Sequence, residues 1–249
     1  MSEEKVIFYV RNHKRAGILN RCNESNSCVI FAHGLGGNKN NFKKLPEIFC
    51  QHGISTFRFD FIGHGESEGN ISDMSVFREV EDLNAAVDFV KNEGYEKIGV
   101  IGHSLGGMVS VLTQNKDVSC ITLLNPVIFG RETFLKLFDM GKLRELERKG
   151  YVTYSTEGNK KIQLGIKFFE EVMKIDIFSK IKEVEVPILF ILSSEDEIIN
   201  PKYSELAFKE TNEPKKLEII KGASHSFDYS RHEIHALETA ALWFKKWFG

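Results

Sequence analysis

The chain has 249 residues, with 33 Lys and Arg against 35 Asp and Glu, so its net charge is −2. A near-neutral chain lacks the broad basic surface that nucleic-acid binding needs, and 20 Gly with 5 Pro are too few for a low-complexity or collagen-like chain. The length lies between one and two typical domains and can bury a large core. Twenty residues are Phe, and this aromatic surface must fill a core, line a pocket, or both.

Runs of β-branched and aromatic residues alternate with helical patterns along most of the chain. Strands are predicted at residues 6–10, 16–21, 28–32, 54–59, 97–101, 118–124, 187–192 and 216–220, the first two antiparallel. Helices are predicted at residues 42–51, 74–91, 105–114, 202–209 and 233–247, and Phe77 is counted into the buried face of the second. Such alternation indicates an α/β fold, with a mostly parallel, twisted sheet of about eight strands flanked by helices.

Residues 126–185 interrupt this alternation. The predicted elements there are a charged helix at 132–149, strands at 151–155 and 161–164 around the turn signal Glu157-Gly158-Asn159, and a helix at 166–173. We therefore expect one core domain made of residues 1–125 and 186–249, with residues 126–185 inserted after the sixth strand of the sheet as a small cap.

The cysteines and the N-terminus indicate the cellular compartment in which the protein is expected. The four cysteines show no CxxC pair and no metal-type spacing; they are Cys22, Cys28, Cys50 and Cys120. The N-terminus is acidic and has no apolar signal region, so a cytoplasmic protein with reduced thiols is expected, with a Cys22–Cys28 bridge as the alternative. Residues 98–115 lack charged side chains, but their four glycines and several hydroxyls make them a poor membrane span.

A candidate nucleophile lies at Gly102-His103-Ser104-Leu105-Gly106, a G-x-S-x-G motif. The motif directly follows the predicted strand at 97–101 and directly precedes the predicted helix at 105–114, which is the context that such a nucleophile turn requires. Glycine neighbours let strand and helix approach closely around a strained serine. Ser104 is the predicted nucleophile; the alternative is an inert serine in a buried glycine-rich turn.

A serine hydroxyl needs a base, normally His, and an acid that orients the base. In sites of this kind the chain order is Ser, acid, His, which leaves three histidines. His232 and His235 fall at the start of the last predicted helix and are interpreted as surface residues. His225 follows the predicted strand at 216–220 in a loop of small residues, and loops at the carboxyl ends of strands hold ligands in such sheets. His225 is the predicted base.

The acid is expected in the cluster Glu195-Asp196-Glu197, because this cluster follows the buried strand at 187–192. Asp196, the middle residue of the cluster, best fits the spacing expected in the loop after this strand. Its two neighbours are interpreted as solvent-exposed. Asp228 is the rival, only three residues beyond the base.

An oxyanion hole completes the predicted chemistry. One donor is the backbone N–H of Leu105, next to the nucleophile, and the other is expected from the loop at residues 33–37, at the N–H of Leu35. Each such donor contributes about 3 kcal/mol of transition-state stabilisation. His33 is interpreted as a side chain that braces this loop.

Taken together, these motifs resemble the α/β-hydrolase superfamily, and most of all its serine hydrolases that include monoglyceride lipases, S33-type peptidases and feruloyl or cinnamoyl esterases. The motifs are HGLGG at residues 33–37, DFIGHGESEG at 60–69, GHSLGG at 102–107, SSEDEIINP at 193–201 and GASHSF at 222–227. The resemblance implies the same roles for Ser104, Asp196 and His225. It also implies a structural loop around Asp60 and His64, and a short α/β cap. One departure is Ser193, where many relatives have Gly.

We therefore expect hydrolysis of a carboxylic ester, of acyl or hydroxycinnamoyl type, through an acyl-enzyme, with no cofactor and no metal. A thioesterase and an amidase or aminopeptidase use the same triad, and a non-catalytic ligand-binding protein is the alternative from another class. Phe129, Phe134 and Phe138 are the substrate-binding candidates of the cap, although most cap phenylalanines are expected to serve packing. The expected partner is a small-molecule ester, without nucleic acid. The oligomeric state stays open, a homodimer included.

Overall fold

The computed structural model describes residues 1–113, 115–156 and 161–249. Within these residues, eight strands form one sheet in the order β1-β2-β4-β3-β5-β6-β9-β10. The strands are β1 (Ser2–Val10), β2 (His13–Arg21), β3 (Ser27–Ala32), β4 (Ser55–Phe59), β5 (Lys97–His103), β6 (Val118–Leu124), β9 (Ile188–Ser193) and β10 (Lys215–Ile220). Only the pairs β1–β2 and β2–β4 are antiparallel, so the prediction of a mostly parallel sheet is confirmed.

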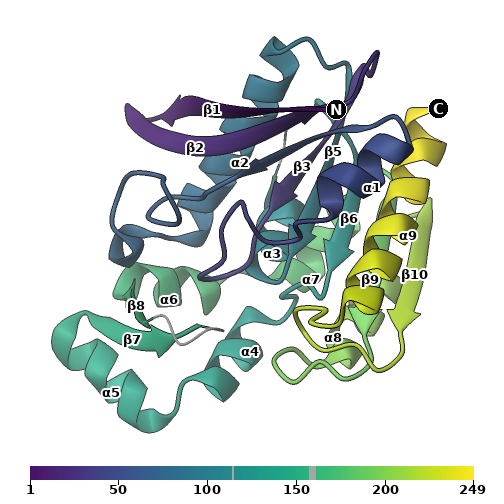
Figure 1. Cartoon of the computed structure of the whole chain (residues 1–249). Coiled ribbons are helices and arrows are strands. Elements are labelled where there is room, and N and C mark those ends of the chain that lie inside the picture. Colours follow the sequence, from purple (N-terminus) through teal and green to yellow (C-terminus); the bar gives the residue numbers. More distant parts are fainter. Residues whose placement is uncertain (114, 157–160) are drawn as a thin grey trace.

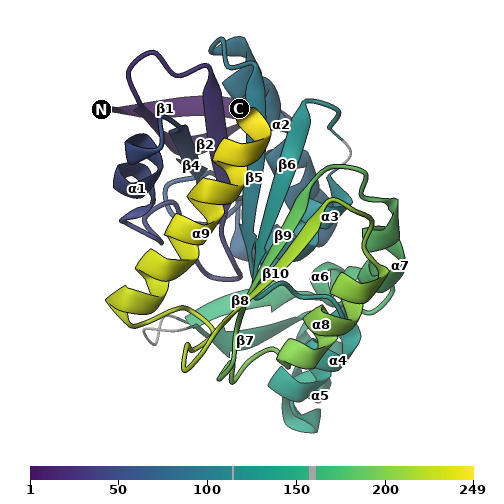
Figure 2. The same cartoon turned by 90° about the vertical axis from the view of Figure 1, so that its right-hand side faces the viewer.

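Helices cover both faces of the sheet (Figure 2). The helices outside the segment between β6 and β9 are α1 (Leu45–Gln51), α2 (Val76–Asn92), α3 (Leu105–Leu112), α8 (Pro201–Glu210) and α9 (Ser230–Phe248), with a short 3-10 helix, η1 (Ile71–Asp73). Successive side chains of a strand point to opposite faces, so a strand covered twice needs a continuous apolar run. In β9, Leu189 and Ile191 pack on the side of α1 and α9, whereas Phe190 packs on the side of α2 and α3.

The first five elements of the segment between β6 and β9 lie together beside the sheet, whereas its last α-helix lies next to α3 (Figure 1). The segment contains α4 (Gly130–Leu137), α5 (Met140–Lys149), β7 (Tyr151–Ser155), β8 (Lys161–Gly165), α6 (Ile166–Val172), α7 (Ile177–Lys180) and η2 (Ile181–Glu183). Strands β7 and β8 pair antiparallel. The predicted turn at Glu157-Gly158-Asn159 lies outside the described residues. We call residues 126–185 the inserted segment.

The single helix predicted at residues 132–149 is wrong, because the structure divides it into α4 and α5. Phe138 has an extended backbone between them, with φ −117° and ψ 107°. Asp139 then caps α5, and its Oδ1 accepts the backbone N–H of Lys142 at 2.9 Å. An aspartate at this position accepts a helix N–H that would otherwise lack a partner. The helical spacing of apolar residues continues across the break, so this spacing alone does not reveal it.

Three further residues differ from the sequence-based expectation. The first helix begins at Leu45 rather than at Phe42, whose φ is +53°. Phe77 was expected in a buried face but is 51% exposed. His232 was expected at the surface but is buried, and its ring packs edge-on against Tyr229.

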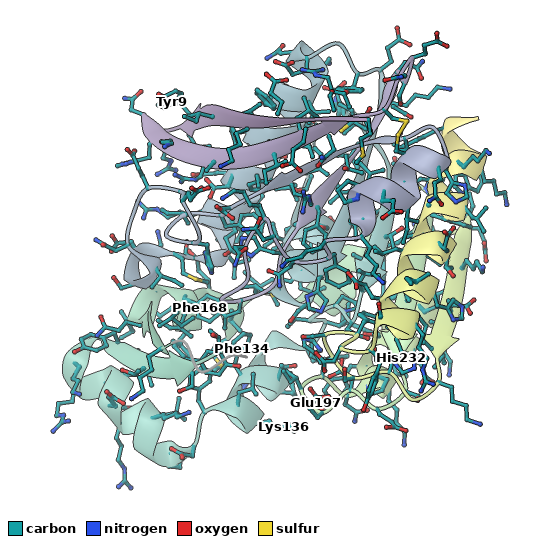
Figure 3. All side chains as sticks on the ribbon, in the orientation of Figure 1. Tyr9, Phe134, Lys136, Phe168, Glu197 and His232 are labelled. Atoms are coloured by element: carbon teal, nitrogen blue, oxygen red, sulfur yellow. A yellow bond between two sulfur atoms is a disulfide. The ribbon has the colours of Figure 1, made fainter. Side chains whose placement is uncertain are left out.

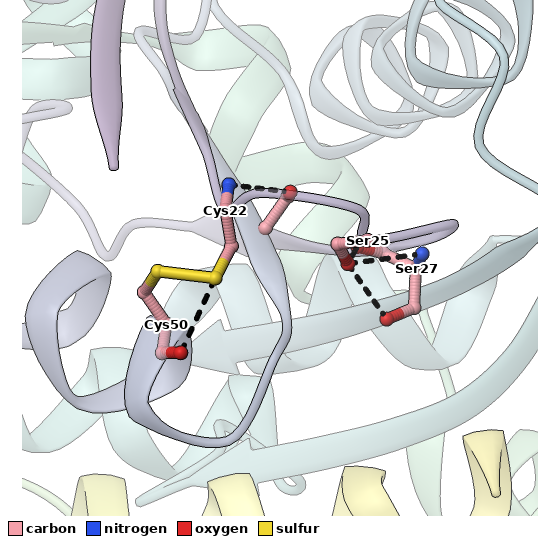
Figure 4. The surroundings of a disulfide bond; sticks show 5 residues. Cys22, Ser25, Ser27 and Cys50 are labelled. Atoms are coloured by element: carbon pink, nitrogen blue, oxygen red, sulfur yellow. Dashed lines mark hydrogen bonds between the residues drawn. A yellow bond between two sulfur atoms is a disulfide. The ribbon is translucent and has the colours of Figure 1, made fainter.

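The thiols also differ from the expectation. Cys22, at the end of β2, forms a disulfide with Cys50 in the last turn of α1, with a Cα–Cα distance of 5.3 Å (Figure 4). Cys28 cannot reach Cys22, because it lies within β3 with its side chain in the core, and it stays a free thiol like Cys120. Both the reduced state of Cys22 and a Cys22–Cys28 bridge are therefore wrong. The pairing removes the thiol argument for a cytoplasmic location.

No helix in the described part of the chain combines the length and the apolar character needed to cross a membrane.

Candidate active site

Ser104 occupies the sharp turn between β5 and α3. Its backbone has φ 54° and ψ −116°, a strained conformation for a residue with a Cβ. The strain persists because the backbone is held: the N–H of Ser104 donates to the carbonyl of Leu124 at 2.9 Å. Gly106 is required by the packing, since a Cβ there would lie 2.2 Å from the carbonyl oxygen of Ala32 in β3. This is the strand–turn–helix geometry that exposes a nucleophilic serine at the carboxyl edge of a sheet.

His225 and Asp196 meet on the loops that follow β10 and β9. The Nδ1 of His225 donates to Oδ2 of Asp196 at 2.7 Å, and both side chains are buried. The other carboxylate oxygen of Asp196 accepts the backbone N–H groups of Ile198 at 2.9 Å and Ile199 at 2.7 Å. Because a carboxylate only accepts, Nδ1 carries the imidazole proton and Nε2 keeps a free lone pair. The rival Asp228 instead accepts the hydroxyl of Ser224 at 2.6 Å.

Ser104 and His225 line the same cavity. No hydrogen bond joins their side chains in the described structure. Such contacts often lengthen in unliganded enzymes and tighten when substrate binds. The arrangement therefore brings the three predicted residues to one place, although the side chains of Ser104 and His225 are not hydrogen-bonded to each other.

The loop after β3 passes directly beside Ser104. A Cβ on Gly34 would lie 3.0 Å from the Cβ of Ser104, so only glycine allows this approach. The N–H of Gly36 is occupied, because it donates to Nε2 of His64 at 3.2 Å. The N–H of Leu35 has no acceptor within the described residues, and that of Leu105 belongs to the first residue of α3, where the helix offers no acceptor. Both N–H groups are thus free to bind an oxyanion.

Buried side chains join the loop after β3 to the loop after β4. His33 donates from Nδ1 to the carbonyl of Gly34 at 2.8 Å, and its Nε2 accepts the N–H of Phe61 at 3.1 Å. Burial lowers the pKa of His33 to about 4, so the ring is neutral near pH 7, as these two bonds require. Asp60 accepts both the backbone N–H of Lys39 at 2.6 Å and its ammonium at 2.5 Å. These contacts fit the expected bracing role of His33, Asp60 and His64.

The cavity has a volume of about 120 Å³. Its described lining includes Leu35, Asn41, Val127, Thr133, Phe134, Leu137, Tyr154, Thr156, Ile198 and Ile199 besides the residues above, and no Asp, Glu, Lys or Arg. Of the three phenylalanines named from the sequence, only Phe134 lines the cavity. Phe129 packs against Phe178 and Tyr203, and Phe138 packs inside the inserted segment.

Three residues near His225 were missed by the sequence analysis. Glu197, interpreted there as solvated, accepts the backbone N–H of His225 at 3.2 Å. Its own carbonyl accepts the ammonium of Lys136 from α4 at 3.0 Å, and Figure 3 shows these two residues side by side. The carbonyl of His225 accepts two side-chain donors, from His103 and Asn125. No local sequence signal marks these contacts, because each joins segments far apart in the chain.

The described residues contain no cluster of three or more His, Cys, Asp or Glu side chains that could hold a metal ion.

The strained serine turn at the carboxyl edge of a mostly parallel sheet, with helices on both faces, defines the class of α/β hydrolases. The model of the serine aminopeptidase S33 family matches residues 23–176, more than half of the chain. The chain therefore belongs to this family.

Individual proteins support the same class. The human monoglyceride lipase is 23% identical over 228 residues, which cover 79% of this chain and 74% of that protein. Matches with three bacterial curated relatives cover 37%, 54% and 66% of the length of those proteins. The structure of Est1E from Butyrivibrio proteoclasticus with bound ferulic acid superimposes with a TM-score of 0.81, covering 95% of this chain and 98% of that one at 21% identity. At this identity the likeness shows the fold alone.

Proposed function

We propose that the chain is a serine carboxylesterase that works through an acyl-enzyme. Ser104 is the nucleophile, His225 the base and Asp196 the acid that orients it, and the N–H groups of Leu35 and Leu105 bind the oxyanion. The observation that carries the proposal is the buried contact of 2.7 Å between His225 Nδ1 and Asp196 Oδ2, because His225 also lines the cavity that holds the strained Ser104.

The reaction follows from the free lone pair on His225 Nε2. This nitrogen takes the proton of the Ser104 hydroxyl while Oγ attacks the ester carbonyl, and the two N–H groups stabilise the negative charge that develops on the carbonyl oxygen. Asp196 stabilises the imidazolium, which then protonates the departing alcohol. Water attacks the acyl-enzyme by the same route and releases the acid, so Ser104 regains its proton.

The cavity supports a small, uncharged acyl group. A cavity of about 150 Å³ holds one benzene ring, and this one measures about 120 Å³. We propose that short aliphatic acyl groups are preferred to hydroxycinnamoyl groups. A free peptide N-terminus carries a positive charge, and the described lining offers no carboxylate to bind it, which favours an ester over an aminopeptidase substrate. A thioester of the same acid remains the second candidate, because the same groups would cleave it.

The inserted segment contributes Phe134, Leu137 and Tyr154 to the lining of the cavity. We propose that residues 126–185 act as a cap on one core domain, residues 1–125 and 186–249, because the acid and the base follow the insertion in the chain while the nucleophile precedes it.

A substrate panel tests the proposal. It compares kcat/KM for p-nitrophenyl acetate, butyrate and octanoate, methyl ferulate, acetyl-coenzyme A and alanine p-nitroanilide. We expect acetate and butyrate to be the best substrates, Ser104→Ala to remove their hydrolysis without changing the circular dichroism spectrum, and a fluorophosphonate probe to label wild type but not the variant. Retained activity in Ser104→Ala, or the absence of label from wild type, would refute the assignment. Faster turnover of the anilide or the thioester would replace the ester by that substrate class.

A further inference from the structure

We propose that Asn125 is a positioning residue that fixes the separation of Ser104 and His225, an inference that rests on the proposed function. Asn125 directly follows β6 and is buried, with no part in the chemistry itself. Its side-chain amide donates to the carbonyl of His225 at 2.8 Å and to the hydroxyl of Ser193 at 2.8 Å. Its Oδ1 accepts the N–H of Ser193, also at 2.8 Å. Both N–H groups and the oxygen of this amide are therefore engaged.

The backbone on either side of Asn125 holds the nucleophile. The carbonyl of Leu124 accepts the N–H of Ser104 at 2.9 Å, and the N–H of Val127 donates to the carbonyl of Ser104 at 3.1 Å. Residues 124–127 thus bind the backbone of Ser104 through their own backbone groups. They bind the backbone carbonyl of His225 through the side chain of Asn125. This short piece of chain links the two residues more directly than the sheet does.

His103 also contacts the carbonyl of His225. Its Nε2 lies 3.1 Å from the carbonyl oxygen of His225, and since a carbonyl only accepts, Nε2 carries the proton. Burial and the nearby His225 lower the pKa of His103 to about 3, so the ring is neutral near pH 7 and donates through its single N–H group. The carbonyl of His225 is therefore held by two donors, and its N–H by the carboxylate of Glu197 at 3.2 Å.

A positioning role explains two features of the local sequence. Asn125 has φ +43°, a conformation that asparagine adopts more readily than most residues. Ser193, the one departure from the pattern that the resemblance suggested, supplies the hydroxyl that accepts the second N–H of the amide. A glycine at 193 would leave that N–H buried without this partner.

Position matters here because proton transfer needs a hydrogen bond between Ser104 and His225, and the described structure has none between their side chains. A displacement of about 1 Å in a reacting group can lower a rate by about 100-fold. Loss of the Asn125 contact should let the His225 loop shift, and this should slow proton transfer while leaving the cavity that binds the acyl group unchanged.

Two variants test the inference. Asn125→Asp keeps the shape of the side chain but loses both N–H donors, and Asn125→Gly loses the side chain but tolerates the positive φ. With p-nitrophenyl acetate, and with active sites titrated by a fluorophosphonate, we expect kcat per active site to fall about 10- to 100-fold in both while KM stays within about twofold. The matched control is Thr122→Val on β6, the strand that Asn125 follows. The buried hydroxyl of Thr122 has no partner in the described structure, so this variant should keep both constants.

A second measurement keeps the inference testable by itself. The proton shared between His225 Nδ1 and Asp196 should give a downfield proton resonance in wild type, and this resonance should broaden or disappear in the two Asn125 variants but not in Thr122→Val. Wild-type kcat per active site together with an unchanged resonance in both variants would overturn the positioning role. If wild type hydrolyses no ester, the proposed function fails. The resonance alone then decides the role of Asn125.

Discussion

The loops around Ser104 and the inserted segment are stabilised in different ways. Loops that follow six strands of the sheet are joined by directional hydrogen bonds, many of them to backbone groups, as at Asp196, Asn125 and Asp60. The inserted segment has an aromatic core instead, in which Phe134, Phe138, Phe168 and Phe169 lie with ring centroids 5.0 to 6.5 Å apart. Figure 3 labels two of these rings, Phe134 and Phe168. Hydrogen bonds fix atoms to a few tenths of an ångström, whereas ring packing tolerates shifts and substitutions. The first region therefore suits chemistry, and the second suits selection among substrates.

The largest effect should come from the hydrogen-bonded region. Asp196→Asn keeps the size of the side chain but removes the carboxylate that selects the Nδ1–H form of His225, and such a change lowers kcat by about 10⁴-fold in a serine protease with this triad. We expect a loss of that order with p-nitrophenyl acetate. The matched control is Asp228→Asn, the rival acid, which should stay within about twofold of wild type. A large loss in the control with activity retained in Asp196→Asn would assign the acid to Asp228.

Acid should affect the same region before it affects the inserted segment, which contains no histidine. Burial lowers the pKa of His33 to about 4 and that of His103 to about 3, whereas an unfolded imidazole has a pKa of about 6.5. Between these limits the unfolded chain binds the protons that the folded chain refuses, so the free energy of unfolding falls as the pH drops below about 6.5. Each histidine contributes about 1.4 kcal/mol per pH unit, or about tenfold in the folding equilibrium.

Urea unfolding at pH 7.0, 6.0 and 5.0 measures this dependence. His33→Gln should reduce the slope by about half. A free energy of unfolding that stays constant from pH 7 to 5 would contradict the role of the buried histidines.

The smallest effect is expected in the inserted segment, and it should change selectivity rather than rate. Phe134→Ala removes a ring that lines the cavity, so longer acyl chains should fit. We expect the ratio of kcat/KM for octanoate to that for acetate to rise about tenfold, the scale on which hydrophobic pockets discriminate chain length. Phe138→Ala, from the same aromatic core but outside the cavity, is the control and should leave the ratio unchanged. Equal ratios in both variants would mean that the ring does not limit acyl size.

The sequence analysis predicted the features that depend on residues close together in the chain. The serine turn, for example, follows from glycines beside Ser104 between an apolar strand and a helix, and the loop positions of Asp196 and His225 follow from the strands that precede them. The strands of the sheet and the antiparallel pairing of the first two agree with the prediction for the same reason, because each apolar run is long enough to show its period.

Other features depend on contacts between distant segments, and no local pattern contains them. Cys50 meets Cys22 only because α1 packs next to the end of β2, and Glu197 becomes a partner of His225 only because β9 and β10 are neighbours. The break at Asp139 is an intermediate case. Its capping side chain was visible in the sequence, but the apolar period on both sides outweighed it.

The order of the strands has a consequence for synthesis of the protein. The serine turn follows β5 in the middle of the sheet, whereas His225 follows β10, the last strand to be made and an edge of the sheet. A growing chain can therefore build the serine turn and the oxyanion loop long before it holds the proposed base. On the ribosome Ser104 would lack its proposed base until synthesis had passed His225, so shorter chains could not attack esters by the proposed route.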